Sequence, residues 1–263
     1  VTQCSPEQSL VALYTFDEGS GTVIHDVSGV APDLDLLISD GDTQWLTGGG
    51  LSINTPALIA SAGVGEKVNE AIRQANQLTI EAWIKSNNVE QDGPARIVTL
   101  SADSQNRNFT LGQGLWNNQP SALYDVRLRT TETDNNGQPS LTTQDGSANT
   151  DLTHLAYVHH ANGSSVIYIN GVVETSEQSG SDLSSWDTSY RLALANELGG
   201  GRPWLGELYR IAIYSCALSS DDINSSFEAG WSPVAEHHPE STHAIHYKYR
   251  HLRSSDGSQN ISK

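Results

Sequence analysis

Residues 166–174 read Val-Ile-Tyr-Ile-Asn-Gly-Val-Val-Glu, and this stretch decides the fold class. Two runs of β-prone residues flank the Asn170-Gly171 pair. Asn and Gly both accept the positive φ angles of a type I′ turn, the commonest two-residue connection between antiparallel strands. The sequence therefore predicts a β-hairpin here.

Similar β-prone segments, bounded by Gly, Asn, Asp and Pro, recur along most of the chain. The other expected strands span residues 10–16, 78–85, 96–102, 108–112, 122–130, 154–160, 191–196 and 205–215. Too few helices separate them for parallel βαβ units. The pattern predicts an all-β, antiparallel sandwich.

The segment 78–85 shows the alternation most clearly. Leu78, Ile80, Ala82 and Ile84 share one face, with Thr79, Glu81, Trp83 and Lys85 on the other. We expect a core face and a mostly solvated face.

Two helices interrupt the strands, over residues 66–74 and after Ser219. Ser219 and Asp222 resemble a capping box, and Gly230 suits the helix end. We predict one sandwich domain over 1–235 and a separate tail over 236–263.

The tail holds five of the nine histidines and has a net charge of +4 − 3 = +1, which leaves the body at −18. Apolar residues alternate with polar ones in its middle and predict one strand with no hairpin partner nearby. Such a strand needs a sheet edge to pair with, so Ile245, Tyr247 and Tyr249 are candidates for an assembly strand.

The net charge of −17 argues against nucleic acid as a partner, because phosphate backbones would be repelled. The sequence contains no run of 18 apolar residues, the length that would predict a membrane-spanning helix. The sequence begins at Val1 and contains no Met, so we expect a mature or excised segment. Cys4 and Cys216 are the only cysteines, and an even pair in a secreted chain favours a disulfide over two free thiols.

Three stretches together resemble the laminin-G-like jelly-roll domains of the concanavalin A-like lectin/glucanase group. They are residues 13–22 with 26–29, residues 78–84 with the hairpin at 168–171, and residues 205–214 with 217–219. The resemblance implies two antiparallel sheets packed face to face, with the first and last strands close together. Members of this group include carbohydrate-binding modules, adhesion domains, lectins and glycoside hydrolases, so the fold does not name the function.

The resemblance also implies a structural Ca²⁺ site at Asp17, Ser20 and Asp26, because hard cations take oxygen ligands. Where relatives often have an acidic pair in the last strand, this chain has Tyr209 and Arg210. The alternative is that Asp17 and Asp26 only cap turns by accepting from backbone N–H groups.

Hydrolases of this group carry two carboxylates as Glu-x-Asp-x-x-Glu on one strand, and no such segment occurs in the sequence. We therefore expect a protein that is not an enzyme.

Sugar sites combine aromatic faces with Asn, Asp and Arg side chains. The candidates are Trp116, Asn117, Arg127, Arg129, Trp186 and Trp204. Arg127 and Arg129 share one face of the expected strand 122–130 and would suit an acidic sugar. The alternative is that the Trp residues pack in the core or at its rim and the Arg residues are solvated.

The leading hypothesis is a secreted, non-catalytic module that binds a glycan or an extracellular protein. One alternative is a structural subunit whose tail strand pairs with a neighbouring sandwich. A second is a glycoside hydrolase or lyase, which fold analogy alone supports.

Overall fold

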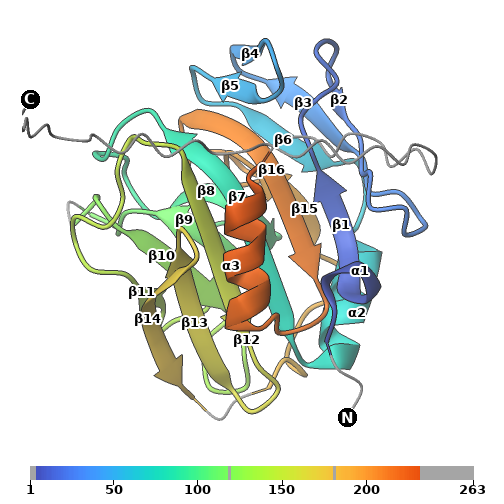
Figure 1. Cartoon of the computed structure of the whole chain (residues 1–263), viewed down its shortest axis with the longest axis vertical. Helices are drawn as coiled ribbons and strands as arrows, with labels where there is room; N and C mark the ends of the chain where they lie inside the picture. The colour runs from blue at the N-terminus through green and yellow to red at the C-terminus, as the bar shows by residue number, and fades with distance from the viewer. Residues whose placement is uncertain (1–3, 118–119, 180–181, 232–263) are drawn as a thin grey trace, which may run out of the picture. The chain divides into compact units, whose positions relative to one another are not determined.

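The computed structural model describes residues 4–117, 120–179 and 182–231, and their strands form two antiparallel sheets (Figure 1). The first sheet contains, in spatial order, β14 (Val172–Gln178), β13 (Ser164–Ile169), β12 (Thr153–His159), β7 (Leu78–Ser86), β16 (Gly206–Tyr214), β5 (Leu51–Ile53) and β4 (Thr43–Trp45), with β1 (Leu10–Tyr14) also paired to β16. The second contains β11 (Leu141–Thr142), β10 (Tyr124–Leu128), β9 (Arg107–Gln113), β8 (Ala95–Ser101), β15 (Arg191–Leu194), β6 (Leu58–Ser61), β3 (Leu36–Asp40) and β2 (Val23–Ile24).

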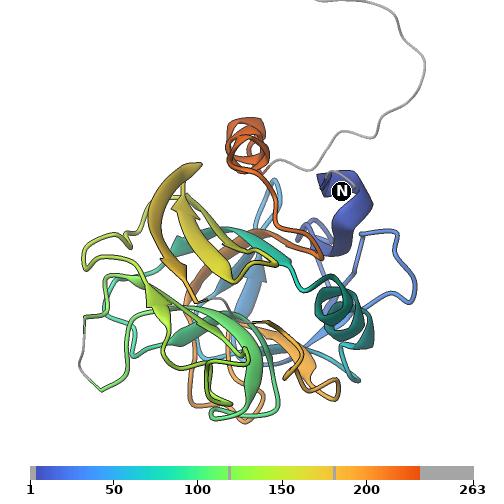
Figure 2. The same cartoon turned by 90° about the horizontal axis from the view of Figure 1, so that it is seen from below.

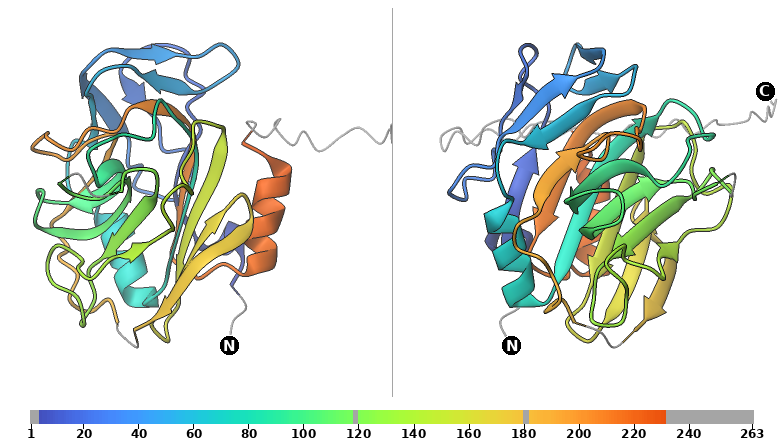
Figure 3. Two further views of the ribbon diagram at one scale, coloured as in Figure 1. Left: turned by 90° about the vertical axis from the view of Figure 1, so that its left-hand side faces the viewer. Right: turned by 180° about the vertical axis from the view of Figure 1, so that it is seen from behind.

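The two sheets pack face to face around one apolar core, as Figure 3 shows from the side. Strand β10 illustrates the alternation: Tyr124, Val126 and Leu128 belong to the core, whereas Asp125 and Arg127 lie between them in sequence and point to the other face. The predicted all-β jelly-roll sandwich is confirmed.

The predicted hairpin and helices are also present. Asn170 and Gly171 have φ angles of 52° and 78°, and they connect β13 to β14. The helices are α1 (Pro6–Ser9), α2 (Glu66–Ala75) and α3 (Ser220–Ala229). Ser219 and Asp222 form the capping box of α3. Among the described residues no helix is long and apolar enough to cross a membrane.

The first and last strands of the sandwich are adjacent. Leu13 of β1 pairs with Ala212 of β16, and the Cys4–Cys216 disulfide joins the segments that flank these strands. The expected disulfide is confirmed.

The expectation of a mostly solvated outer face on β7 is wrong. Thr79, Glu81 and Trp83 are all at most 5% exposed, because α3 and the segment that leads into it cover this face of the first sheet (Figure 2). The Phe227 ring of α3 stacks on the Trp83 ring, with centroids 5.9 Å apart.

Six short strands were not predicted from the sequence: β2, β3, β4, β5, β6 and β11. Each has at most five residues, and β3 for example pairs with β6 about twenty residues away. Their pairing is set by distant partners rather than by local pattern.

A buried ion pair holds the loop after β1. Lys67 of α2 pairs with Asp26, and their side chains are 6% and 0% exposed. The same Lys67 ammonium donates to the carbonyl of Val30 at 2.6 Å. Burial opposes the charge on Asp26, but bonds from Lys67, Ser28 and Leu34 outweigh it and lower the pKa of this carboxyl group.

We predict that Lys67→Met lowers the free energy of unfolding by about 3 kcal/mol, because it leaves a buried carboxylate unpaired. In the control Lys85→Met the lost partner is Glu207 at 3.6 Å and Lys85 is 47% exposed, so the loss stays below about 1 kcal/mol. Urea unfolding at pH 7 measures both. As the pH falls through the lowered pKa of Asp26, the difference from the wild type should shrink, because the protonated carboxyl no longer needs its cation. Equal losses for the two variants at pH 7 would contradict the prediction.

The disulfide is expected to stabilise the sandwich mainly by restricting the unfolded chain. It joins residues separated by 212 positions. We predict that the Cys4→Ser/Cys216→Ser double variant loses up to about 5 kcal/mol of unfolding free energy, measured in urea. The wild type with dithiothreitol should match the variant, and an unchanged midpoint in both samples would refute this.

His159 of β12 is a fully buried histidine, and its Nδ1 lies 2.9 Å from the Ser165 hydroxyl. Burial, together with the neighbouring His160, lowers the pKa of His159 to about 4. In the unfolded chain this histidine has an ordinary pKa of about 6.5. As the pH falls, the unfolded chain therefore takes up a proton at a higher pH than the folded chain does. Acidification therefore favours unfolding through this group.

We predict that His159 removes up to about 3 kcal/mol of stability as the pH falls from about 6.5 to about 4. Unfolding free energies of the wild type and of His159→Gln, measured at pH 7, 5.5 and 4, test this. The variant should lose less stability across that range, whereas parallel curves would exclude a role for His159.

Candidate functional site

The outer face of the second sheet carries a pocket of about 440 Å³, which we call the arginine pocket. Loops cover this face: Arg107 N–H donates to the Asn135 carbonyl, and Arg96 N–H donates to the Arg202 carbonyl. The residues lining the pocket are Pro94, Arg96, Ser104, Gln105, Trp116, Arg127, Asn136, Gln138 and Arg202. Three are arginines, and none of these lining residues is acidic.

Arg96 and Arg127 form the inner part of the pocket. Arg96 is 1% exposed, and its Nε donates to Glu197 at 3.1 Å. Its Nη1 donates to the carbonyl of Pro94. Arg127 is 7% exposed, and its Nε donates to Asp125 at 3.1 Å. Both guanidinium groups are thus fixed by buried carboxylates.

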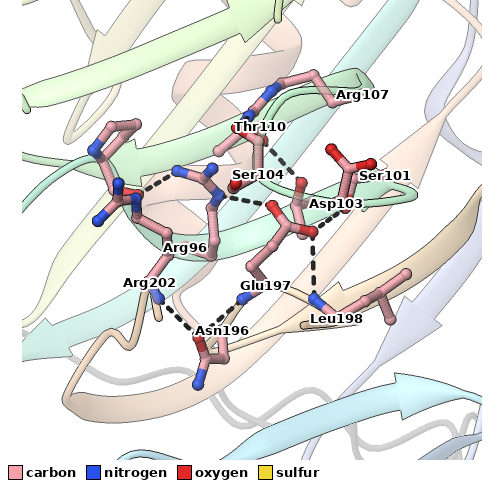
Figure 4. A network of polar contacts seen from close by, with 12 residues as sticks. Arg96, Ser101, Asp103, Ser104, Arg107, Thr110, Asn196, Glu197, Leu198 and Arg202 are labelled. Carbon is pink, nitrogen blue, oxygen red and sulfur yellow. Dashed lines mark hydrogen bonds and ion pairs between the residues drawn. The ribbon is translucent and has the colours of Figure 1, made fainter. Parts of the chain in front are cut away.

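Glu197 organises the network behind the pocket (Figure 4). This fully buried carboxylate accepts from Arg96 through Oε2. Its Oε1 accepts from the Ser101 hydroxyl and from Leu198 N–H at 3.1 Å. Glu197 belongs to the segment that follows β15, so this segment holds Arg96 of β8 in place.

Arg107 adds a third buried guanidinium behind the pocket. Its Nη1 donates to the Thr110 hydroxyl at 2.9 Å, and its Nη2 donates to the Ser104 carbonyl. Within the described part of the chain its buried Nε has no hydrogen-bond partner. Burial, followed by the charge of Arg96, lowers the pKa of Arg107 to about 9.

Arg96 shows the same trend. Burial lowers the pKa of this arginine to about 10, although Glu197 acts in the opposite direction. Arg127 and Arg202 contribute further to the decrease. The neighbouring arginines therefore add to the effect of burial on Arg96, whereas Glu197 offsets part of that effect.

Trp116 forms the rim of the pocket. Its side chain is exposed at 53%, and the Arg202 guanidinium carbon lies 3.9 Å from its ring centroid. Arg202 also pairs with the exposed Asp92 at 3.7 Å. Stacking between Arg202 and Trp116 fixes the orientation of an aromatic ring that remains accessible to solvent.

The structure brings together two of the six predicted sugar-binding residues, Trp116 and Arg127. Asn117 follows Trp116, is exposed, and does not line the pocket. Arg129 lies beyond the end of β10, and its Nη1 contacts the Tyr190 hydroxyl at 3.4 Å instead. Arg127 and Arg129 therefore do not share a site as expected.

The placement of Trp186 and Trp204 at a sugar-binding surface is wrong, because both rings are in the core. Trp204 is fully buried and donates to Gln113 Oε1 at 3.1 Å. Trp186 is 5% exposed and donates to the Arg129 carbonyl at 2.8 Å. Neither ring presents a face to a ligand.

Sequence reasoning missed Arg96, Arg107 and Arg202, which come from different strands and loops. Arg96 is the first residue of the predicted strand 96–102, and Arg107 directly precedes the predicted strand 108–112. A charged residue at a strand end normally suggests exposure. The distant Glu197 makes the burial of Arg96 tolerable, and no local pattern signals such a partner.

The Ca²⁺ site predicted at Asp17, Ser20 and Asp26 stays a prediction. Asp26 Oδ1 accepts from Leu13 and Ser28 N–H, and Oδ2 accepts from Leu34 N–H and pairs with Lys67. Its oxygens are thus already occupied. Among the described residues no group of three or more His, Cys, Asp or Glu side chains is placed to hold a metal. The predicted assembly strand with Ile245, Tyr247 and Tyr249 lies outside the described residues.

A larger cavity of about 790 Å³ lies beside α3 on the outer face of the first sheet. Glu81, one of its lining residues, lies 3.0 Å from His154 Nε2. Burial opposes the charge on Glu81, but His154, Ser226 and Tyr214 together lower the pKa of its carboxyl group. This carboxylate is therefore engaged in holding α3 to the sheet.

Comparisons with known proteins agree with this architecture. A family model described as the concanavalin A-like lectin/glucanases superfamily matches residues 62–224. No curated protein sequence matches the chain.

Solved structures similar to this chain include the binding domain of botulinum neurotoxin serotype D/C, with a TM-score of 0.61, 14% identity, and coverage of 86% of this chain and 53% of that one. A second is the binding domain of botulinum neurotoxin DC in complex with rat synaptotagmin II, with a TM-score of 0.60, 14% identity, and coverage of 86% and 52%. A third concerns botulinum neurotoxin type C, which depends on interaction with two ganglioside molecules to enter cells; its TM-score is 0.60 at 15% identity, with coverage of 85% and 52%.

At these identities the likeness to the solved structures establishes the fold, and the chain spans about half the length of each structure. The family model covers more than half of this chain. The chain therefore belongs to the concanavalin A-like lectin/glucanases superfamily, in its laminin-G-like group.

Proposed function

We propose that this chain is a secreted, non-catalytic module that binds a glycan in the arginine pocket. The observation that carries the proposal is the half-exposed Trp116 ring, which borders a pocket lined by hydroxyl, amide and guanidinium groups. An aromatic face suits the apolar side of a pyranose ring, and the polar groups suit its hydroxyls.

Two further observations support a binding role. The superfamily includes lectins, and similar structures are binding domains, one of a toxin that interacts with gangliosides, whose head groups are glycans. A glycosidase site would need two carboxylates facing the sugar, and the residues lining the arginine pocket include no carboxylate. The disulfide suits an oxidising, extracellular compartment.

A glycan microarray with the folded chain tests the proposal. We expect binding to at least one glycan class, and Trp116→Ala should weaken that binding by about tenfold or more, because the stacking surface is lost. Val172→Ala is the matched control, since Val172 is 68% exposed on β14 and does not line the pocket. Silence of the array with protein that unfolds cooperatively would reject the glycan-binding role.

A further inference from the structure

Two guanidinium groups in the arginine pocket have unused donors. Arg96 uses Nε for Glu197 and Nη1 for the Pro94 carbonyl. Arg127 uses Nε for Asp125 and Nη1 for Asn136 at 3.0 Å. In the described chain, neither Nη2 atom donates to another protein group. Both side chains line the pocket, so these nitrogens are available to a ligand.

The buried part of this network has one positive charge in excess. Arg96, Arg107 and Arg127 contribute three, and the fully buried carboxylates Glu197 and Asp125 remove two, which leaves 3 − 2 = +1. Water cannot easily screen a charge that is buried in this way.

The remaining acids of this region lie at its rim and do not cancel the excess inside. Asp92 is the exposed partner of Arg202. Asp103 is exposed, and its Oδ1 accepts from the backbone N–H groups of Gln105 and Asn106. Solvent screens both carboxylates.

The other lining groups suit the rest of a sugar. The side chains of Ser104, Gln105 and Gln138 form no hydrogen bond with the described protein, so they can bond to ring hydroxyls. Trp116 offers its ring at the rim. The pocket thus combines a charged inner end with a neutral polar and aromatic outer end.

We infer that the arginine pocket selects acidic saccharides, in which one carboxylate or sulfate group accepts from Nη2 of Arg96 and of Arg127 while the sugar ring packs on Trp116. The inference rests on the proposed glycan-binding function, and it adds that the bound glycan is negatively charged. A single negative group matches the single excess positive charge, and guanidinium groups bind planar or tetrahedral oxyanions through charge-assisted hydrogen bonds.

Titration calorimetry with matched probes tests the charge. Sialyllactose and monomeric galacturonic acid each provide one carboxylate, and their methyl esters keep the shape without the charge. Lactose is the neutral sugar, and 6-sulfolactose provides the sulfate. We expect the acidic form to bind at least about tenfold more tightly than its neutral counterpart in one or both classes. A preference between sialyllactose, galacturonic acid and 6-sulfolactose identifies the source of the acidic group.

Two variants separate the role of charge from the role of the donor. Asp125→Asn raises the buried excess from +1 to +2 and should tighten acidic binding at least about threefold, which simple damage to the fold would not do. Asp125→Asn/Arg127→Gln restores the excess to 2 − 1 = +1 but removes one donor. It should weaken acidic binding about tenfold and lactose binding by clearly less, so that the preference for the acidic sugar falls.

Arg73→Gln is the control, because among the described residues this exposed arginine of α2 pairs only with Glu70, at 3.5 Å, and it lies outside the pocket lining. It should bind every probe like the wild type. Thermal unfolding of each variant confirms that the compared proteins are folded.

The outcomes distinguish the inference from the proposed function. If methyl esters and lactose bind as tightly as the acids, and Trp116→Ala abolishes this binding, the glycan-binding function stands and acidic selection is overturned. Weaker acidic binding by Asp125→Asn also overturns it. If no saccharide binds to the folded wild type, the glycan-binding function itself fails.

Discussion

The architecture depends on the pairing of β16, because this strand joins the parts of the first sheet that come from opposite ends of the chain. It pairs with β7 on one side and with β1 and β5 on the other. To enter the first sheet from β15 in the second, the chain must cross between the layers. Ala195 begins that crossing with a φ of 62° and donates its N–H to the Ile97 carbonyl at 3.2 Å.

The same crossing creates the arginine pocket. Its first residues place Glu197 beside Arg96, its later residues supply Arg202 to the rim, and Trp204 returns into the core. The pocket is therefore a product of how the sandwich closes, and buried carboxylates hold the guanidinium groups of its inner wall. A site of this kind is preorganised, which reduces the entropy cost of binding.

The sequence was informative where structure is decided locally. Asn170-Gly171 specifies its own turn, and Ser219 with Asp222 specifies the start of α3. It was uninformative where partners are distant. The short strands between residues 23 and 61 depend on neighbours across the sheet, and the outer face of β7 is buried only because α3, about 140 residues later, packs on it.

The candidate site shows the same limit. Trp116 could be identified because an aromatic residue next to Asn117 in a turn tends to be exposed. Trp186 and Trp204 have similar surroundings in sequence, yet each indole N–H finds an acceptor that allows it to be buried. Arg96 looks like a solvated strand end until Glu197, 101 residues later, lies against it.

The chain as a whole is negatively charged, whereas the arginine pocket is locally positive, and this difference affects which ligands the pocket selects. A net charge of −17 repels anions at a distance, so long-range attraction cannot draw an acidic ligand to the surface. The buried arginines act at short range, where burial weakens the screening of their charge. The negatively charged sandwich would repel an extended polyanion along the whole length of the polymer. One acidic group on a short saccharide meets this repulsion only until that group enters the pocket, so these charges favour small, singly charged ligands over polymers.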